Sequence, residues 1–307
     1  MIIRYLVYSE IDQDKWDACI RNSSNGLIYA YAWYLNISSP HWEALVLNDY
    51  EAVLPLTKRK KIGINYLYQP PFCAELGVFS IKTVNPSLVD QMLEKIPDKF
   101  LYVDICLNRQ NQPNPAKFPF RLRKNHILSL LHPYEYIAKQ YADNHKRNIK
   151  KAKSAGLFWA KDIPVDHAIQ MTDETLKDIA PLSGQDKRIF KDLFLHAGSM
   201  HQAICTGVKD QNNKLLSVAV FFFAEGTWYY LLAGSTKEGR AKGAAHFLID
   251  QFIKEYAGSD QYLDFEGSDV SSLAFFYKGF GSQEFFYPAL LLNRLPRWIK
   301  WIKSLKG

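Results

Sequence analysis

The residues whose types and spacing could do chemistry are concentrated in one stretch, residues 227–280. A strand-like apolar run leads into a Gly-rich basic turn, and a helical pattern with apolar residues at three- and four-residue spacing follows it. Gly-rich backbone before a helix offers free N–H groups and a positive dipole to an anion, such as the pyrophosphate of an acyl-CoA. The predicted cofactor-binding residues of this turn are Gly234, Ser235, Arg240, Lys242, Gly243, Ala244 and Ala245.

Two carboxylates stand in the next predicted strand, residues 262–266. Asp264 and Glu266 are two residues apart, so on a strand their side chains face the same side. Glu266 lies at the strand end where a substrate would enter, and it is our candidate general base for deprotonating an amine, directly or through water. Asp264 is a candidate substrate-binding residue. The alternative for Glu266 is structural, because a carboxylate at such an end often caps the following helix or pairs with a nearby cation.

Two motifs in this stretch resemble a known family. Residues 240–245, R-x-x-G-x-A, resemble the Q/R-x-x-G-x-G/A signature of the GNAT acyltransferase superfamily. Residues 274–280, A-x-x-Y-K-G-F, resemble a shortened form of that family's A-x-x-x-Y-x-x-x-G-F helix end. The resemblance implies attack of an amine on an acyl-CoA thioester, with Tyr277 as the donor to the leaving thiolate. The alternatives are an ordinary strand-to-helix connection with a capping glycine and a core aromatic at Tyr277.

A basic helix in the middle of the chain resembles a second group of proteins. Residues 144–156 resemble the N-x-x-R-x-x-I-x-K-A-x-x-x-G helix of Fem-type peptidoglycan aminoacyl transferases and related tandem-GNAT proteins, with imperfect spacing at the apolar position. Residues 264–268, D-F-E-G-S, are also similar to these proteins. The resemblance implies phosphate-bearing substrates, and Arg147 could bind a phosphate bidentately with Lys151 nearby. The alternative is that these cations form only a solvated helix face.

Composition is that of a globular protein with an anionic partner. The 307 residues favour two domains, and 38 Lys and Arg against 31 Asp and Glu give a net charge of +7. No signal peptide or membrane-spanning run is evident, so we expect a cytoplasmic protein. The resemblance to Fem-type transferases implies a bacterial enzyme. The cysteines form no C-x-x-C pair and are expected to be buried reduced thiols: Cys19, Cys73, Cys106 and Cys205. No His or Cys grouping has zinc-site spacing, so no metal is expected.

Both halves of the chain share one order of hairpin, helix and strand. In the first half, residues 41–56 read as a hairpin, and Asn85 with Pro86 begins a helix that a strand at residues 100–105 follows. We therefore predict an α/β (α+β) fold of two tandem GNAT-like domains, each a mixed sheet flanked by helices. The N-terminal domain, residues 1–130, lacks the cofactor loop, and residues 131–307 form the C-terminal domain.

Three further segments have less specific patterns. The basic run at residues 58–61 is expected to be a solvated turn, and the Pro- and Asn-rich residues 108–119 a linker or long surface loop. The C-terminal residues 294–306 combine regularly spaced cations with an apolar helical arc containing two tryptophans. Such a helix could lie in a membrane interface, giving a peripheral membrane association, or dock on the protein itself.

These patterns predict an N-acyltransferase that moves an acyl group from acetyl-CoA or another acyl-CoA to a small-molecule amine, such as a cell-envelope, amino-sugar or amino-acid precursor. One alternative is a Fem-like aminoacyl transferase that uses aminoacyl-tRNA and in which the turn at residues 240–245 is a vestige. Another is a non-catalytic binding module for anionic ligands. The acceptor is open: the aromatic segments 29–34 and 66–72 could line a pocket between the halves or belong to the core.

Overall fold

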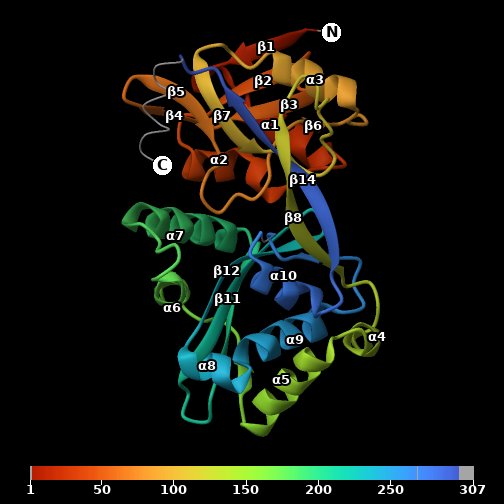
Figure 1. Ribbon diagram of the computed structural model, residues 1–307, viewed down its shortest axis with the longest axis vertical. Helices are drawn as coiled ribbons and strands as arrows, with labels where there is room; N and C mark the ends of the chain where they lie inside the picture. The colour runs from red at the N-terminus through yellow and green to blue at the C-terminus, as the bar shows by residue number, and fades with distance from the viewer. Residues whose placement is uncertain (1, 268, 297–307) are drawn as a thin grey trace. The chain divides into compact units, whose positions relative to one another are not determined.

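The computed structural model describes residues 2–267 and 269–296, and the chain forms two compact units (Figure 1). Unit 1 combines Met1–Arg123 with the segment from Phe286 onward, and unit 2 is Lys124–Phe285. The sequence placed one boundary at 130/131 and the whole C-terminus in the second domain. The structure differs because strand β14, Gln283–Asn293, leaves unit 2 and pairs through Ala289 to Asn293 with strand β7 of unit 1.

Unit 1 contains two sets of strands. An antiparallel sheet has the order β1-β2-β3-β6, and a second set has the order β4-β5-β7-β14 with β5 and β7 parallel. The strands are β1 Ile3–Leu6, β2 Glu43–Leu47, β3 Ala52–Leu56, β4 Lys58–Lys61, β5 Ile64–Tyr68, β6 Phe79–Ser80 and β7 Phe100–Cys106. The helices are α1 Gln13–Asn22, α2 Ala32–Ser38 and α3 Pro86–Glu94, with short 3-10 turns at Tyr8–Glu10 and Ile28–Ala30.

The local predictions for unit 1 are mostly confirmed. β2 and β3 form the expected hairpin. The Asn85 side chain accepts a hydrogen bond from the Leu88 N–H and so caps α3, with Pro86 at its first turn. The exception is the run predicted as a turn, which is strand β4: its backbone pairs with β5, and the Arg59 guanidinium lies 4.0 Å from the centroid of the Tyr68 ring. A strand at the edge of a sheet tolerates such cations because one side faces solvent.

Residues 108–119 form a mostly exposed loop of unit 1, which agrees with the predicted long surface loop and not with a linker. Asn108 and Asn111 are buried, and the Asn111 side-chain oxygen accepts a hydrogen bond of 2.6 Å from the Val78 N–H. The Asn108 amide donates to the Leu76 carbonyl at 3.0 Å. The polar composition therefore serves backbone groups inside unit 1, and the chain passes to unit 2 within strand β8, Phe120–Ser129.

Unit 2 is a mixed sheet with helices on both faces. The strand order is β8-β13-β12-β11-β10-β9, antiparallel except for the pair β12 and β13. The remaining strands are β9 Phe158–Ala160, β10 Ala203–Lys209, β11 Leu215–Ala224, β12 Thr227–Ser235 and β13 Tyr262–Asp264. The helices are α4 Tyr134–Lys139, α5 Asp143–Ser154, α6 Val165–Leu176, α7 Gly184–Ser199, α8 Lys237–Lys242, α9 Ala244–Tyr256 and α10 Ser271–Lys278.

Neighbouring aromatic residues of β11 show how the two faces are covered. Phe221 stacks on Phe252 of α9 at 3.8 Å between ring centroids, while Phe222 packs at 6.1 Å against Phe190 of α7. Successive side chains of a strand point to opposite faces, so α9 and α7 lie on opposite sides of the sheet. Phe221, Phe222 and Phe252 are completely buried.

Three other expectations concern the whole chain. All four cysteines are buried and free, as predicted. No helix within residues 2–267 and 269–296 is long and apolar enough to cross a membrane. The predicted amphipathic C-terminal helix falls almost entirely on residues 297–307, which lie outside the described part of the chain.

Candidate active site

The two parallel strands of unit 2 pair over only three residues, and the candidate site lies past the end of the shorter strand, β13. β12 and β13 pair only from Thr227 to Tyr229, opposite Tyr262 to Asp264, whereas β12 continues to Ser235. Along its other edge β12 has an irregularity: Val220 pairs with Leu232 and Phe221 with Tyr230, so Leu231 is an extra residue. Such a bulge bends a strand and leaves one residue out of the ladder, and bulges are over-represented next to active sites.

Glu266 lies just past the end of β13 in a conformation that the sequence does not suggest. The strand ends at Asp264, and Glu266 has φ of +65°. Strand alternation therefore no longer applies at Glu266, and the predicted shared face of the two carboxylates is wrong. A non-glycine residue at positive φ is strained, so the surrounding structure must hold Glu266 in this conformation.

Asp264 provides part of that hold. Its side chain is buried, and one carboxylate oxygen accepts hydrogen bonds from the Glu266 N–H at 2.7 Å and from the Asn125 amide at 2.9 Å. The same turn is tightened at Gly267, where a Cβ would lie 2.5 Å from the Lys124 carbonyl oxygen. Asp264 was predicted to bind substrate. In the structure its hydrogen bonds orient the turn that carries Glu266.

Tyr277 of α10 lies beside this turn. Its ring stacks on Phe265 at 4.7 Å between centroids and meets the Tyr230 ring edge-on at 6.2 Å. Burial and the charge of Glu266 both raise the pKa of Tyr277. The pKa of Tyr230 is also raised, mainly by burial and to a smaller extent by the neighbouring Tyr277. Both phenols are therefore protonated at neutral pH and can donate hydrogen bonds. The structure brings together the two residues that the sequence predicted as catalytic.

The surroundings of Glu266 suit proton transfer. Burial raises the pKa of its carboxyl well above the usual value for glutamate, although part of the residue remains accessible to solvent. A general base works best when its pKa is near the working pH, and enzymes raise the pKa of glutamate by burial for this purpose. A base next to two phenol donors can deprotonate an amine and stabilise negative charge on an oxygen or sulfur.

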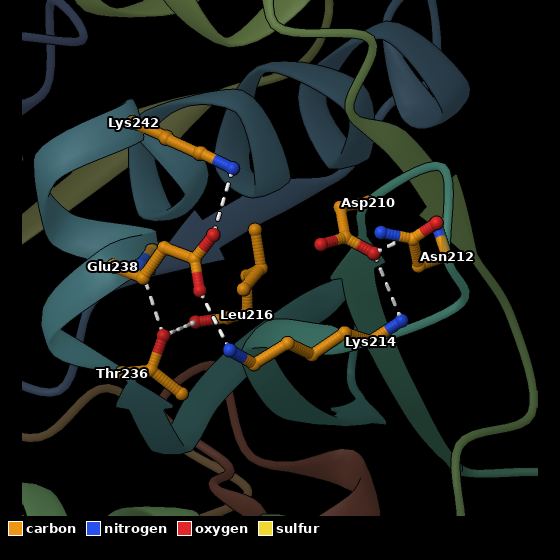
Figure 2. Close-up of polar contacts among 8 residues, drawn as sticks. Asp210, Asn212, Lys214, Leu216, Thr236, Glu238 and Lys242 are labelled. Atoms are coloured by element: carbon orange, nitrogen blue, oxygen red, sulfur yellow. Dashed lines mark hydrogen bonds and ion pairs between the residues drawn. The ribbon is translucent and has the colours of Figure 1, made fainter.

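The predicted cofactor turn is largely a short helix (Figure 2). Thr236 caps α8 by accepting from the Gly239 N–H at 2.9 Å, which explains why this polar stretch is helical. Glu238 lies between Lys214 and Lys242, each at 2.7 Å, and the two ammonium groups lower the pKa of Glu238 to about 2. The sequence predicted free cations here, but Lys242 is paired with Glu238.

The other cofactor-binding candidates are hydrogen-bonded to or closely packed against other residues of unit 2. The Arg240 guanidinium is exposed and donates to the Ser235 carbonyl at 2.6 Å. A Cβ on Gly234 would lie 2.7 Å from the Met171 carbonyl carbon of α6. Gly243 joins α8 to α9 at φ of +75°, and a Cβ there would lie 2.5 Å from the Asn148 carbonyl oxygen of α5. The first residues of α9 follow directly, with Ala244 buried and Ala245 half-buried.

The basic helix α5 flanks this junction. His145, Ile149 and Ala152 are buried, and Asn148 contacts the α8–α9 connection at Gly243. Arg147 and Lys151 are exposed, so their charges are available to a ligand in solution. The predicted basic helix is confirmed as α5. The Asn148 carbonyl of this helix lies next to Gly243, the residue at which the sequence predicted an anion site.

Several residues of the site carry no sequence signal. Tyr230 is one aromatic in an aromatic strand, and the bulge at Leu231 depends on pairing with β11. His126 of β8 is buried near Tyr277, with 6.2 Å between ring centroids, and burial lowers the pKa of its imidazole. His145 was not predicted as a site residue, because the pattern of the basic helix indicates only a cationic face. Among the described residues, no group of three or more His, Cys, Asp or Glu could hold a metal ion.

Comparisons with known proteins agree on the fold. No protein-family model matches the chain, and no curated protein sequence matches it. Among solved structures, FemX is similar over 94% of this chain and 97% of that chain, with TM-score 0.67 and 13% identity. A tandem GNAT protein from the clavulanic acid biosynthesis pathway has TM-score 0.56 and 10% identity over 94% of this chain and 98% of that one.

A further similar structure is L-PGS from Bacillus licheniformis, with TM-score 0.55 and 12% identity over 95% of both chains. These identities are low, whereas the alignments extend over nearly the whole chain in each case. This chain therefore has the mixed α/β, tandem GNAT-like fold, related to that of Fem-type transferases.

Proposed function

We propose that this protein is an N-acyltransferase that moves an acyl or aminoacyl group from an activated carrier to an amine. The observation that carries the proposal is the grouping of Glu266, Tyr277 and Tyr230 past the end of β13. The amine nitrogen attacks the carbonyl carbon of the carrier ester or thioester, and Glu266 takes the proton that the nitrogen loses. The bond from the carbonyl carbon to the carrier then breaks, and Tyr277 donates to the departing oxygen or sulfur.

The bulge of β12 supplies a further group for this chemistry. The carbonyl oxygen of the donor becomes negative during the attack and needs a hydrogen-bond donor that is already in place. Leu231 is out of register with the ladder to β11, and it is flanked by Tyr230 in the candidate site. We assign the Leu231 N–H as the group that faces this oxygen.

Aminoacyl-tRNA is the carrier that we favour. Two cations of α8 have partners, Lys242 on Glu238 and Arg240 on the Ser235 carbonyl, and Glu238 also pairs with Lys214 of the β10–β11 loop. Arg147 and Lys151 of α5 are exposed. A line of exposed cations on a helix suits an extended phosphate backbone better than one pyrophosphate group.

Acyl-CoA is the second candidate carrier. The R-x-x-G-x-A pattern stands at the α8–α9 connection, where the amino-terminal N–H groups of α9 follow Gly243. The ion pairs of Lys214 and Lys242 are partly exposed, and exposed pairs are worth only about 0–1 kcal/mol, so a pyrophosphate could replace them. The acceptor amine, for which we propose a cell-envelope, amino-sugar or amino-acid precursor, is the same for both carriers.

A binding experiment with a double variant of α5 separates the two carriers. Replacing Arg147 and Lys151 by Ala should weaken binding of aminoacyl-tRNA about tenfold and reduce the slope of log K against log salt by about 2, because two phosphate contacts are lost. Lys191→Ala on α7 removes a half-exposed cation that pairs with Asp166, away from α5, and should change neither quantity. Binding and transfer with acetyl-CoA, and none with aminoacyl-tRNA, would select the second candidate. Neither carrier binding the wild-type chain would refute the proposed function.

A second experiment tests the role of Tyr277. Tyr277→Phe removes the phenol hydroxyl and keeps the ring that stacks on Phe265. We expect kcat to fall about 10²-fold with little change in affinity for the carrier, because the hydroxyl acts chiefly as the carrier leaves. Stopped-flow or radiolabel transfer assays with the carrier identified above measure both quantities. An unchanged kcat would return Tyr277 to a packing role.

A further inference from the structure

The helix that carries Tyr277 is held by two side chains and by contacts at its end. Within α10, Tyr277 is the one buried residue and Phe276 is half-buried against the core, while Leu273 and Phe275 are 45% and 62% exposed. A short helix that buries so few side chains gains limited stability from packing, so polar contacts at its end add to what fixes its position. The last carbonyl groups of a helix have no partner within the helix and are available for such contacts.

His145 of α5 makes one of these contacts. The Nε2 atom of its ring lies 2.8 Å from the Phe276 carbonyl oxygen, in the last turn of α10. A carbonyl oxygen can only accept, so Nε2 carries the hydrogen and Nδ1 is the bare ring nitrogen. The residue is completely buried, and within the described part of the chain Nδ1 has no hydrogen-bond partner. Burial lowers the pKa of His145, which keeps the ring in this neutral form.

The position of the ring also explains a glycine of the sequence motif. Gly279 has φ of −65°, a value that any residue adopts, so its backbone does not require glycine. A Cβ on Gly279 would overlap the His145 ring, which occupies the space next to the glycine. The Gly279 carbonyl in turn accepts from the Ala142 N–H, just before α5, at 2.9 Å. The start of α5 and the end of α10 are therefore held at two adjacent points.

The next carbonyl along α10 is held separately. The Ser282 hydroxyl donates to the Tyr277 carbonyl at 2.9 Å, and the Phe280 N–H donates to the same oxygen at 3.1 Å. The backbone on both sides of the Tyr277 side chain is thus fixed by groups outside the helix. Of these, the His145 contact is the one that comes from a different helix.

We propose that His145 is a positioning residue for Tyr277, holding the end of α10 so that the phenol stays beside Glu266. The proposal rests on the proposed function for its catalytic meaning, while the placement of the ring is a structural statement. The contact of His145 also links the basic helix α5 to the catalytic group, because His145 and Arg147 lie in the first turns of that helix. Movement of α5 on binding a phosphate-bearing carrier would reach Tyr277 through this contact.

Three variants test the contact. His145→Gln replaces the ring donor by an amide N–H at a similar reach, whereas His145→Phe keeps a ring and removes the donor. His246→Phe is the matched control, because the His246 ring packs at 4.7 Å from His145 and 4.9 Å from Phe276 and holds no carbonyl of α10. Denaturation curves establish that all three are folded.

The first readout needs no substrate. The stacked rings of Phe265 and Tyr277 should give ring-to-ring NOEs in the wild type, in His145→Gln and in His246→Phe, and these NOEs should weaken in His145→Phe. The second readout is transfer. We expect His145→Phe to lower kcat about tenfold with unchanged KM for the carrier, since misplacement of a reacting group by about 1 Å can cost up to 10²-fold. His145→Gln should recover most of this loss.

A double variant distinguishes positioning from general damage. In the Tyr277→Phe background, His145→Phe should cause no further loss of kcat, because the hydroxyl that it positions is already absent. Unchanged Phe265–Tyr277 NOEs in a folded His145→Phe variant, or equal kcat losses in both backgrounds, would overturn the proposal. Full activity of Tyr277→Phe would instead refute the catalytic role of Tyr277, and the NOEs alone would then decide the structural claim.

Discussion

Replacing Glu266 with Gln is expected to lower kcat by about 10³-fold, within the range of 10²–10⁴ typical for a general base. Gln keeps the size of the side chain but cannot take a proton from the attacking amine. The KM for the carrier should stay close to the wild-type value, because the carboxylate acts on the acceptor nitrogen. Steady-state transfer assays measure both constants, and Glu255→Gln, at an exposed ion pair with Lys161, is the control.

The pH dependence gives the same residue an independent signature. Because burial raises the pKa of Glu266, the base is lost by protonation as pH falls through a value well above that of an ordinary glutamate. The acidic limb of the wild-type rate profile should therefore lie at unusually high pH and disappear in Glu266→Gln. A transfer rate near that of the wild type, with the acidic limb unchanged, would assign Glu266 to a structural role.

The stability of Glu266→Gln checks that a lost rate is not unfolding. A raised pKa in the folded state means that the folded chain binds the proton more tightly than the unfolded chain. The wild type is then most stable below the unfolded pKa and loses stability as pH rises through the folded pKa. Gln does not ionise, so the variant should be at least as stable as the wild type at neutral pH, as measured by chemical denaturation.

Gly243→Ala is expected to lower the free energy of unfolding by about 2–5 kcal/mol. About 1–2 kcal/mol comes from placing an L-residue at φ of +75°, and about 1–3 kcal/mol from the new Cβ, which would lie 2.5 Å from the Asn148 carbonyl oxygen. That oxygen belongs to helix backbone and cannot move without moving α5. Urea denaturation of the full-length protein gives the difference directly.

A second glycine separates the two contributions. Gly258 has φ of +82° and nothing within 4 Å of an added Cβ, so Gly258→Ala should cost only the conformational part, about 1–2 kcal/mol. Equal losses for the two variants would show that α5 does not press on the α8–α9 connection. A weaker carrier affinity in Gly243→Ala, beyond the effect of stability, would add support to an anion site at this junction.

The sequence by itself determined the elements and their order. Alternating and three- to four-residue apolar spacing predicted the β2–β3 hairpin, α3 with its Asn85 cap, and the strands and helix α9 of unit 2, because these patterns depend on neighbours a few residues away. Glu266 was proposed as a base from its place near the end of a predicted strand, whereas the donor role of Tyr277 came from the resemblance to the GNAT superfamily. The tandem GNAT-like fold follows from that order.

Tertiary structure decided what these residues face. The left-handed conformation of Glu266 depends on Asp264 and Asn125, which are far apart in the chain, and the bulge at Leu231 depends on register with β11. The same holds for the turn predicted to bind a cofactor, where Glu238 pairs with Lys214 from the loop between β10 and β11. Periodicity in a sequence reports burial along one element, whereas pairing across elements depends on distances that the chain sets only when it is folded.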